Sequence, residues 1–221
     1  MDKQIWEKVD GYFAQTFGLE DSILQQVQEN CRRAELPAIS ISAPQGMFLQ
    51  ILVAGIRARR ILEVGTLGGY SGIWLARGMP EEGRLVTVEY EAKHAGVAQS
   101  NFALAGLDRK IQLINDSGSR ALKQMIENGE PAFDLIFLDA DKPGYAEYLE
   151  LSLKLAHSGT VIVADNVVRN GEVANPECEE ERVVGIKRYL QAAAASPQLL
   201  STALQTVGSK GYDGFSISIV K

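Results

Sequence analysis

From Arg60 onward, short apolar runs alternate with segments that have the hydrophobic spacing of helices. Strands that are apolar almost throughout, separated by helices, are typical of a parallel sheet covered on both faces. The pattern therefore predicts an α/β domain with a doubly wound, mostly parallel sheet. The runs expected to form its strands are RILEVG (60–65), RLVTVE (84–89), KIQLIN (110–115), FDLIFLD (133–139) and TVIVAD (160–165).

Helices are expected before the first of these strands and between the others. Their apolar spacing places them at residues 6–17, 22–34, 44–58, 70–79, 91–106, 119–129 and 145–156. After the fifth run, Asn175 and Pro176 are typical of an N-cap and a first helical position, and they predict a helix that begins there. Two last strands, 198–205 and 215–221, are expected to form an antiparallel pair joined by a turn at 209–214.

The composition limits the classes of partner. The chain has 221 residues and a formal net charge of −6, whereas proteins that bind nucleic-acid backbones are normally basic. Two small basic groups, Arg32–Arg33 and Arg57–Arg60, are interpreted as solvated helix ends. No apolar run is long enough to predict a membrane-spanning helix. The two cysteines, Cys31 and Cys178, form no metal or redox motif, so a cytoplasmic location is the simplest expectation.

The first strand ends in the glycine-rich stretch ILEVGTLGGYSG. Ligands of doubly wound sheets bind beyond the carboxyl ends of the strands, and Gly65, Gly68 and Gly69 allow close approach of the backbone to a ligand. The spacing is not the G-x-G-x-x-G of nicotinamide dinucleotide sites, and Glu63 would repel a pyrophosphate. Glu89 ends the second strand, where an acid can accept hydrogen bonds from ribose hydroxyls. These features favour S-adenosylmethionine, a cationic nucleoside without phosphate.

Polar side chains follow the fourth and fifth strands. Asp139 closes the fourth strand, and Asp165 and Asn166 close the fifth. If these strands are parallel neighbours, the three side chains meet at one sheet edge and form an oxygen set that suits Mg²⁺ or Ca²⁺. A strand-end cap or turn would explain one such aspartate, but the pair beside a glycine loop favours a functional site. Zinc is not expected, because His94 and His157 lie far from these motifs in the sequence.

Lys142 follows Asp139 by one turn and is the candidate general base. An amine that is buried or close to a divalent cation gives up its proton more readily, which suits it to proton removal near neutral pH. The alternative is an ordinary solvent-facing lysine. Two roles stay open for Asp141: the N-cap of a helix that starts before Pro143, or orientation of groups near the cofactor.

These motifs resemble the cation-dependent class I O-methyltransferases, which include catechol O-methyltransferase and the plant caffeoyl-CoA O-methyltransferases. The stretches LEVGTLGGYSGIWLA, VTVEYE, FDLIFLDADKPGY and VIVADNVVRNGEV carry the resemblance, which runs from about Ile39 to the C-terminus and is to the small bacterial members in particular. It implies a Rossmann-like sheet of seven strands with a reversed C-terminal hairpin. It also implies one domain, 1–221, in which residues 1–58 form helices bordering the acceptor site and residues 59–221 form the cofactor-binding core.

The resemblance implies roles for individual residues as well. Methyl transfer from S-adenosylmethionine, which becomes S-adenosylhomocysteine, to a hydroxyl of a catechol-like aromatic compound would use Lys142 as the base. The metal, Mg²⁺, Ca²⁺ or Mn²⁺, would be bound by Asp139, Asp165 and Asn166. Members are often homodimers. The residues with an implied cofactor contact are Ile39, Ile41, Glu63, Gly65, Tyr70, Ser71, Glu89, Asp116, Ser117 and Asp139.

Two departures from the family pattern leave the acceptor open. Arg169 stands where plant members commonly have an aromatic residue. The glutamate that helps to hold the second ring hydroxyl in the animal catechol enzyme has no evident counterpart here. The corresponding turn offers Lys210, Tyr212 and Asp213 as candidates.

Three other functions are weighed against the small-molecule acceptor. Methylation of a hydroxylated base in tRNA would use the same chemistry, with the arginines at 32–33 and 57–60 as a local patch, although the acidic net charge disfavours it. An NAD-dependent oxidoreductase is disfavoured because the G-x-G-x-x-G motif is missing. A binding module without catalysis is disfavoured because the metal and base motifs are intact.

Overall fold

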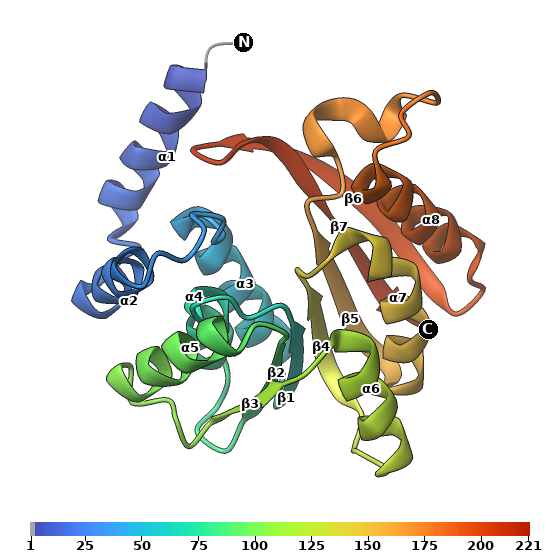
Figure 1. Cartoon of the computed structure of the whole chain (residues 1–221), viewed down its shortest axis with the longest axis horizontal. Coiled ribbons are helices and arrows are strands. Elements are labelled where there is room, and N and C mark those ends of the chain that lie inside the picture. The colour runs from blue at the N-terminus through green and yellow to red at the C-terminus, as the bar shows by residue number, and fades with distance from the viewer. Residues whose placement is uncertain (1–2) are drawn as a thin grey trace.

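A seven-stranded sheet lies between two layers of helices in the computed structural model, which describes residues 3–221 (Figure 1). The strand order is β3-β2-β1-β4-β5-β7-β6; the first five strands are parallel, and β7 is antiparallel to both of its neighbours. The expected doubly wound α/β fold with a reversed C-terminal hairpin is confirmed. The strands are β1 (Arg60–Val64), β2 (Arg84–Glu89), β3 (Ile111–Asn115), β4 (Phe133–Leu138), β5 (Ala156–Asp165), β6 (Leu199–Gly208) and β7 (Gly211–Val220).

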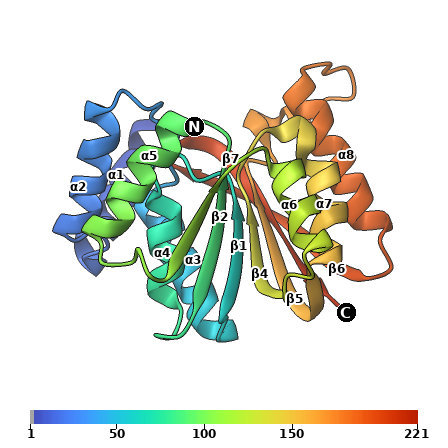
Figure 2. The same cartoon turned by 60° about the horizontal axis from the view of Figure 1, so that its bottom comes forward.

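The helices form two groups, one on each face of the sheet (Figure 2). The first group covers one face and includes the three N-terminal helices: α1 (Lys3–Phe17), α2 (Ser22–Arg33), α3 (Ala43–Ile56), α4 (Tyr70–Gly78) and α5 (Ala92–Leu104). The second group covers the other face: α6 (Gly118–Glu127), α7 (Tyr145–Lys154) and α8 (Glu181–Ala195). Two short 3₁₀ helices, η1 (Lys142–Gly144) and η2 (Arg169–Ala174), follow β4 and β5. Within residues 3–221, no helix combines the length and apolar character needed to cross a membrane.

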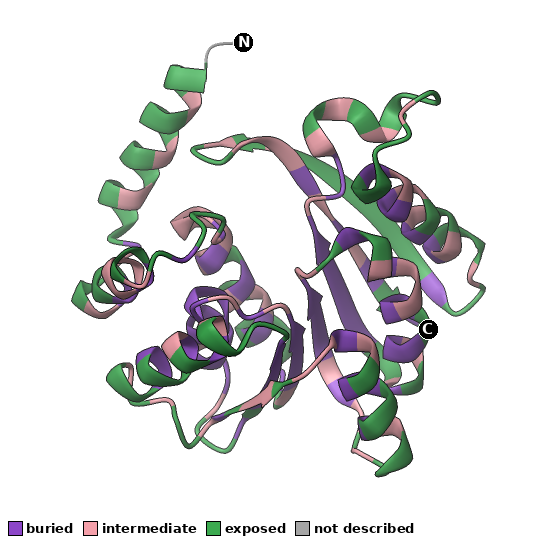
Figure 3. Ribbon diagram, viewed as in Figure 1, coloured by how far each residue is buried: buried purple, intermediate pink, exposed green. Residues whose placement is uncertain are grey.

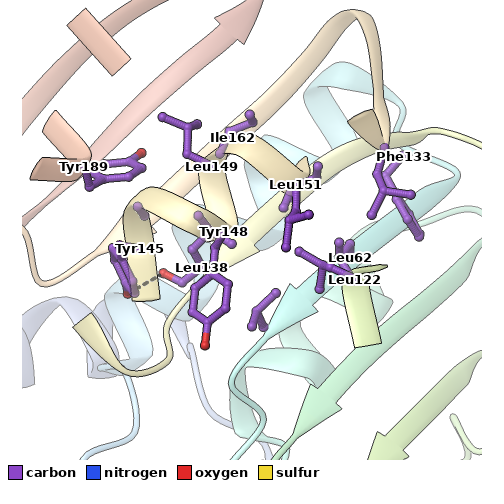
Figure 4. Close-up of a cluster of buried hydrophobic side chains, with 14 of the residues drawn as sticks. Leu62, Leu122, Phe133, Leu138, Tyr145, Tyr148, Leu149, Leu151, Ile162 and Tyr189 are labelled. Carbon is purple, nitrogen blue, oxygen red and sulfur yellow. Dashed lines mark hydrogen bonds between the residues drawn. The ribbon is translucent and has the colours of Figure 1, made fainter. Parts of the chain in front are cut away.

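Each face of the sheet has its own hydrophobic core. On the α6–α8 side, residues of β1, β4 and β5 pack against Tyr145, Tyr148 and Tyr189 (Figure 4). On the other side, Trp74 and Phe102 are fully buried among residues of α3, α4 and α5. Burying a side chain of Leu, Ile or Phe size stabilises a fold by roughly 1.5–3 kcal/mol. The near-continuous apolar strands are explained by this double coverage, which Figure 3 shows as buried colour across the central strands.

Three of the predicted boundaries that differ from the structure have a clear local cause. The helix predicted at 145–156 ends at Lys154, and Ala156 already belongs to β5. This early start of β5 is irregular: the pairing register with β4 shifts there, and the Thr160 hydroxyl donates to the carbonyl of Phe133 (2.6 Å). The hairpin turn predicted at 209–214 is shorter, because β7 begins at Gly211, whose φ of 101° closes the turn opposite Gly208.

The predicted start of the last helix is the third error. Asn175 does not cap α8, which begins at Glu181. Its side chain instead accepts a hydrogen bond from the Glu177 N–H (3.1 Å), which makes a local turn that competes with helix formation. Glu180 is the N-cap residue, and Glu181 lies in the first turn near the positive end of the helix.

The register of the parallel strands brings their carboxyl ends to one level. Val64 lies opposite both Val88 and Leu138, and Leu138 lies opposite Ala164. The next residue of each strand is therefore at the same edge of the sheet, and these residues are Gly65, Glu89, Asp139 and Asp165. Three of these four residues carry carboxylates, and ligands of such sheets bind at this edge, so it is the candidate ligand-binding site.

Gly65 is the tightest point of that edge and gives the first prediction. Its φ is 102°, and a Cβ atom there would lie 2.0 Å from the carbonyl oxygen of Asp139. Gly65→Ala is therefore expected to lower the free energy of unfolding by about 2 kcal/mol or more, because strain and a backbone clash add. Gly96→Ala, in the open middle of α5, is the matched control and is expected to stabilise by about 0.5–1 kcal/mol. Urea unfolding of both variants tests this, and equal effects would contradict it.

Candidate active site

The backbone of the glycine loop after β1 is fixed by hydrogen bonds to Glu89. The carboxylate of Glu89 accepts hydrogen bonds from the N–H groups of Leu67 (2.7 Å) and Thr66 (3.2 Å). Leu67 adopts a left-handed φ of 49°, which these bonds stabilise, and Gly69 (φ 83°) leads into α4. The other oxygen of Glu89, Oε1, accepts from the Glu91 N–H (2.9 Å), so about one of the four acceptor positions of this carboxylate remains for a ribose hydroxyl.

Glu63 is fully buried beneath the same loop. Its two oxygens accept hydrogen bonds from the hydroxyls of Ser71 and Thr87, both at 2.6 Å. Burial raises the pKa of Glu63 to about 7, and the negative charges of Asp139 and Glu89 act in the same direction. A cationic ligand would reverse this effect by favouring the ionised carboxylate.

The remaining predicted cofactor residues differ in what they offer a ligand. Tyr70 is buried against Trp74, and its hydroxyl is already paired because it donates to Glu20 (2.7 Å). Asp116 accepts hydrogen bonds from the Ser117 N–H (2.6 Å) and from Arg120 (2.7 Å). Ser117 is the N-cap of α6, so both residues lie where β3 passes into that helix.

The segment before α3 is joined to the strand ends by Gln45. A capping box links Ser42 and Gln45 at the start of α3, and the Gln45 amide also donates to Asp165 at 3.4 Å. Ile41 is buried beside these residues, whereas Ile39 is 67% exposed. The S-x-x-Q pattern is the sequence signal that would have identified Gln45.

The expected metal ligands do meet at the sheet edge. Asp165 is buried, and Asn166 follows it with a left-handed φ of 58°, a conformation that asparagine tolerates well. Burial raises the pKa of Asp165 to about 7, and the negative charge of Asp139 acts in the same direction. Among residues 3–221, no group of three or more His, Cys, Asp or Glu side chains is arranged to hold a metal, so the predicted set depends on the amide of Asn166. Two carboxylates and one amide oxygen fit a hard cation.

Lys142 is buried between the two strand ends and is held by three contacts. Its Nζ donates to Asp139 Oδ1 (3.0 Å) and to the Tyr145 hydroxyl (2.6 Å), and it lies 4.6 Å from the centre of the Tyr145 ring. It is therefore not the solvent-facing lysine of the alternative interpretation.

Tyr145 is, like Gln45, a residue of this edge that was not predicted from the sequence. Its hydroxyl donates toward the carbonyls of Leu138 (2.8 Å, dashed in Figure 4) and Asp165 (3.2 Å), so it bridges the ends of β4 and β5. Burial, reinforced by the charges of Asp139 and Asp165, raises the pKa of Tyr145 well above its usual range. It stays a neutral hydroxyl, which fixes where the Lys142 amine lies.

Asp141 caps η1, as the first of its two expected roles required. One oxygen accepts from the Gly144 N–H (3.2 Å), and the other accepts from the Tyr148 hydroxyl (2.5 Å). Both partners belong to the polypeptide that follows β4. Asp141 therefore supports the turn that carries Lys142.

A groove of about 620 Å³ opens beside Asn166. It is bounded by the start of α1, the segment before α3 and the β6–β7 turn. Asp213 fixes one wall, since its Oδ1 accepts from the N–H groups of Val168, Arg169 and Gly214, each at 3.0 Å. Of the three candidates in the turn, Lys210 and Asp213 line the groove and Tyr212 does not.

The fold and this site define a class: an α/β protein with a glycine-rich loop of the kind that binds nucleoside cofactors and a groove at the same sheet edge. Comparison with known proteins agrees. Residues 14–211 match the family described as O-methyltransferase. A catechol O-methyltransferase of Niastella koreensis is 46% identical over the full length of both chains.

Solved structures are similar over the whole chain. An O-methyltransferase from Bacillus cereus, in complex with S-adenosylhomocysteine, is 46% identical with a TM-score of 0.98 and full coverage of both chains. One from Streptomyces achromogenes, in complex with S-adenosylmethionine, is 41% identical with a TM-score of 0.96 and covers 100% of this chain and 99% of its own. The chain belongs to the O-methyltransferase family and is an O-methyltransferase.

The geometry around Lys142 predicts a specific effect of Tyr145→Phe. Loss of the hydroxyl leaves Lys142 with one partner fewer, so kcat is expected to fall about ten-fold, the effect of about one lost hydrogen bond to a charged group. Tyr189→Phe is the matched control, because it removes a buried hydroxyl from the same core, bonded to Ser216 rather than to Lys142. Both variants should lose about 1 kcal/mol of stability. Equal kcat values for the two variants would contradict the role of Tyr145.

Proposed function

We propose that the protein transfers the methyl group of S-adenosylmethionine to one hydroxyl of a catechol-like aromatic compound, with a divalent cation as cofactor. One observation carries the proposal: Asp139, Asp165, Asn166 and the amine of Lys142 lie at one sheet edge, and the acceptor groove opens there. The names of the related proteins, a catechol O-methyltransferase among them, support this acceptor class.

The proposed cofactor site is the glycine loop and its surroundings. The buried Glu63 favours a cation, and Glu89 offers a remaining acceptor position for a ribose hydroxyl. Asp116 and Ser117 at the end of β3 would border the adenine, and Ile39 and Ile41 would cover the cofactor. Gly65 and Ser71 complete the loop, with Tyr70 contributing its backbone. Residues 59–221 form the proposed cofactor-binding core, and residues 1–58 border the acceptor.

Asp139, Asp165 and Asn166 would hold the cation, Mg²⁺ or alternatively Ca²⁺ or Mn²⁺. When bound there, a divalent cation would supply Lewis-acid chemistry that lowers the pKa of an acceptor hydroxyl. Asp165 supports this assignment, because burial beside Asp139 disfavours its charged form unless a cation is near.

Side chains of the protein would remove the proton and position the acceptor. Lys142, held by Asp139 and Tyr145, would remove a proton from one acceptor hydroxyl. The resulting oxygen nucleophile would attack the methyl group in line with the sulfonium bond, and S-adenosylhomocysteine would leave. Most of the rate enhancement would come from positioning, since the groove and the cofactor loop meet at one edge.

The placement of the arginines supports a small acceptor over tRNA. Arg32 and Arg33 both pair with Glu29, and Arg60 pairs with Glu130. The stretch 57–60 leads into the amino end of β1, whereas the site lies beyond its carboxyl end. Neither group therefore adds a basic surface to the groove.

A homodimer in the cytoplasm is the proposed state of the enzyme. No residue of α1 is buried, and apolar side chains are exposed on α1 and on the edge strand β6, among them Tyr12, Phe17, Leu200 and Leu204 (Figure 3). Exposed apolar surface of this kind is typical of protein interfaces. Both cysteines are free thiols, which fits a reducing compartment.

Removal of the metal tests the proposed function. With a catechol as acceptor, a chelator is expected to abolish methyl transfer and added Mg²⁺ to restore it. Asp139→Ala is expected to lower kcat by at least about 100-fold, since it removes a ligand and a partner of Lys142. S-adenosylhomocysteine binding, measured by calorimetry, should largely survive. Asp108→Ala, a change at an exposed aspartate outside the site, is the matched control. Full turnover without metal would refute the proposal.

A further inference from the structure

The groove beside Asn166 has a surplus of positive charge in an otherwise acidic protein. Lys3, Arg169 and Lys210 line it together with only two carboxylates, those of Asp10 and Asp213. The formal net charge of the whole chain is −6, so this surplus is local.

Both carboxylates are occupied by backbone groups. Asp10 Oδ2 accepts a hydrogen bond from the Ser209 N–H at 2.7 Å, which joins α1 to the β6–β7 turn. Asp213 Oδ1 accepts from three N–H groups around the loop after β5. Both carboxylates therefore serve mainly to hold the backbone that forms the walls of the groove.

The positively charged side chains that line the groove form few or weak ion pairs with carboxylates. Lys210 donates to the carbonyl of Ala38 (2.9 Å), and no carboxylate within residues 3–221 forms an ion pair with it. Lys3 reaches Glu7 only at 3.8 Å in an exposed pair that contributes little, and the half-buried Arg169 reaches the exposed Glu180 only at 4.0 Å. Partial burial lowers the pKa of Lys210, and the charge of Lys3 acts in the same direction against the opposing effect of Asp139. A cation in this position gains from an anionic partner.

Apolar side chains line part of the groove. Ile39 is largely exposed there, and the rings of Phe48 and Phe215 lie 5.1 Å apart. Asn166 and Gln45 line the groove where it meets the sheet edge, and Lys210 lies at the turn between β6 and β7. A ligand that complements this lining has a pair of hydroxyls, a flat apolar body and an anionic group.

We propose that the preferred acceptor is a catechol ring whose side chain ends in a carboxylate, and that Lys210 binds this carboxylate. The inference rests on the proposed function and adds a specificity-determining residue to it. A nucleic-acid phosphate is the less favoured anion, because the basic groups at 32–33 and 57–60 lie outside the groove.

A matched set of acceptors tests this inference. Three vicinal dihydroxyphenyl compounds with the same side chain would end in a carboxylate, a neutral carboxamide or an ammonium group. For the wild-type enzyme with Mg²⁺, kcat/KM is expected to be about ten-fold higher for the acid than for the amide, as for one charge-assisted hydrogen bond. The ammonium compound should be the poorest of the three.

Variants assign the preference to one side chain. Lys210→Gln keeps a hydrogen-bond donor but removes the charge, and it should bring the acid-to-amide ratio close to one. Lys210→Arg should retain most of the ratio. Lys154→Gln, a change at an exposed lysine at the end of α7, is the matched control for total charge and should keep the wild-type ratio.

The outcomes separate this inference from the proposed function. Turnover of the amide with no preference for the acid, or an unchanged ratio in Lys210→Gln, overturns the role of Lys210 and leaves the catechol function standing. Turnover of tRNA with none of the three catechols contradicts both.

Discussion

The level register of four parallel strands is the constraint on which the site depends. Val88, Val64, Leu138 and Ala164 lie opposite one another across the sheet. The residue after each one is therefore delivered to the same edge. A shift of one residue in any strand would turn its terminal side chain to the other face of the sheet. The apolar packing of both faces prevents such a shift, so the two cores that stabilise the fold also fix the positions of Asp139 and Asp165.

Burial disfavours the charged form of two carboxyl groups at this edge. Glu63 and Asp165 both have a pKa raised to about 7, in each case chiefly by burial. Lys142 and the hydroxyls of Ser71 and Thr87 supply part of the compensation from within the chain. A sulfonium cofactor beside Glu63 and a divalent cation beside Asp165 would supply the rest. Glu63 and Asp165 are therefore unfavourable as buried charges without ligands, and two cationic ligands would stabilise their ionised forms.

Much of this arrangement was predictable from the sequence, because local pattern and strand order determine it. Apolar runs identified the strands, and acids after successive runs indicated where Asp139 and Asp165 would meet. The errors have local causes, such as the turn that Asn175 makes with its own backbone in place of a helix cap. What could not be predicted depends on contacts between distant segments. The Tyr145 hydroxyl has its role only because β4 and β5 end side by side, and Lys210 faces Ala38 only because the hairpin folds back over the groove.

The central claim is that the strand-end oxygens bind one divalent cation. Titration of the protein with Mn²⁺, followed by the electron paramagnetic resonance signal of the free ion, measures this without any acceptor. We expect about one bound ion per chain, and an affinity at least about ten-fold weaker in Asp165→Asn, which replaces a charged ligand by a neutral one. Equal affinity in the wild type and in Asp165→Asn would contradict the claim, as would the absence of binding at millimolar Mn²⁺.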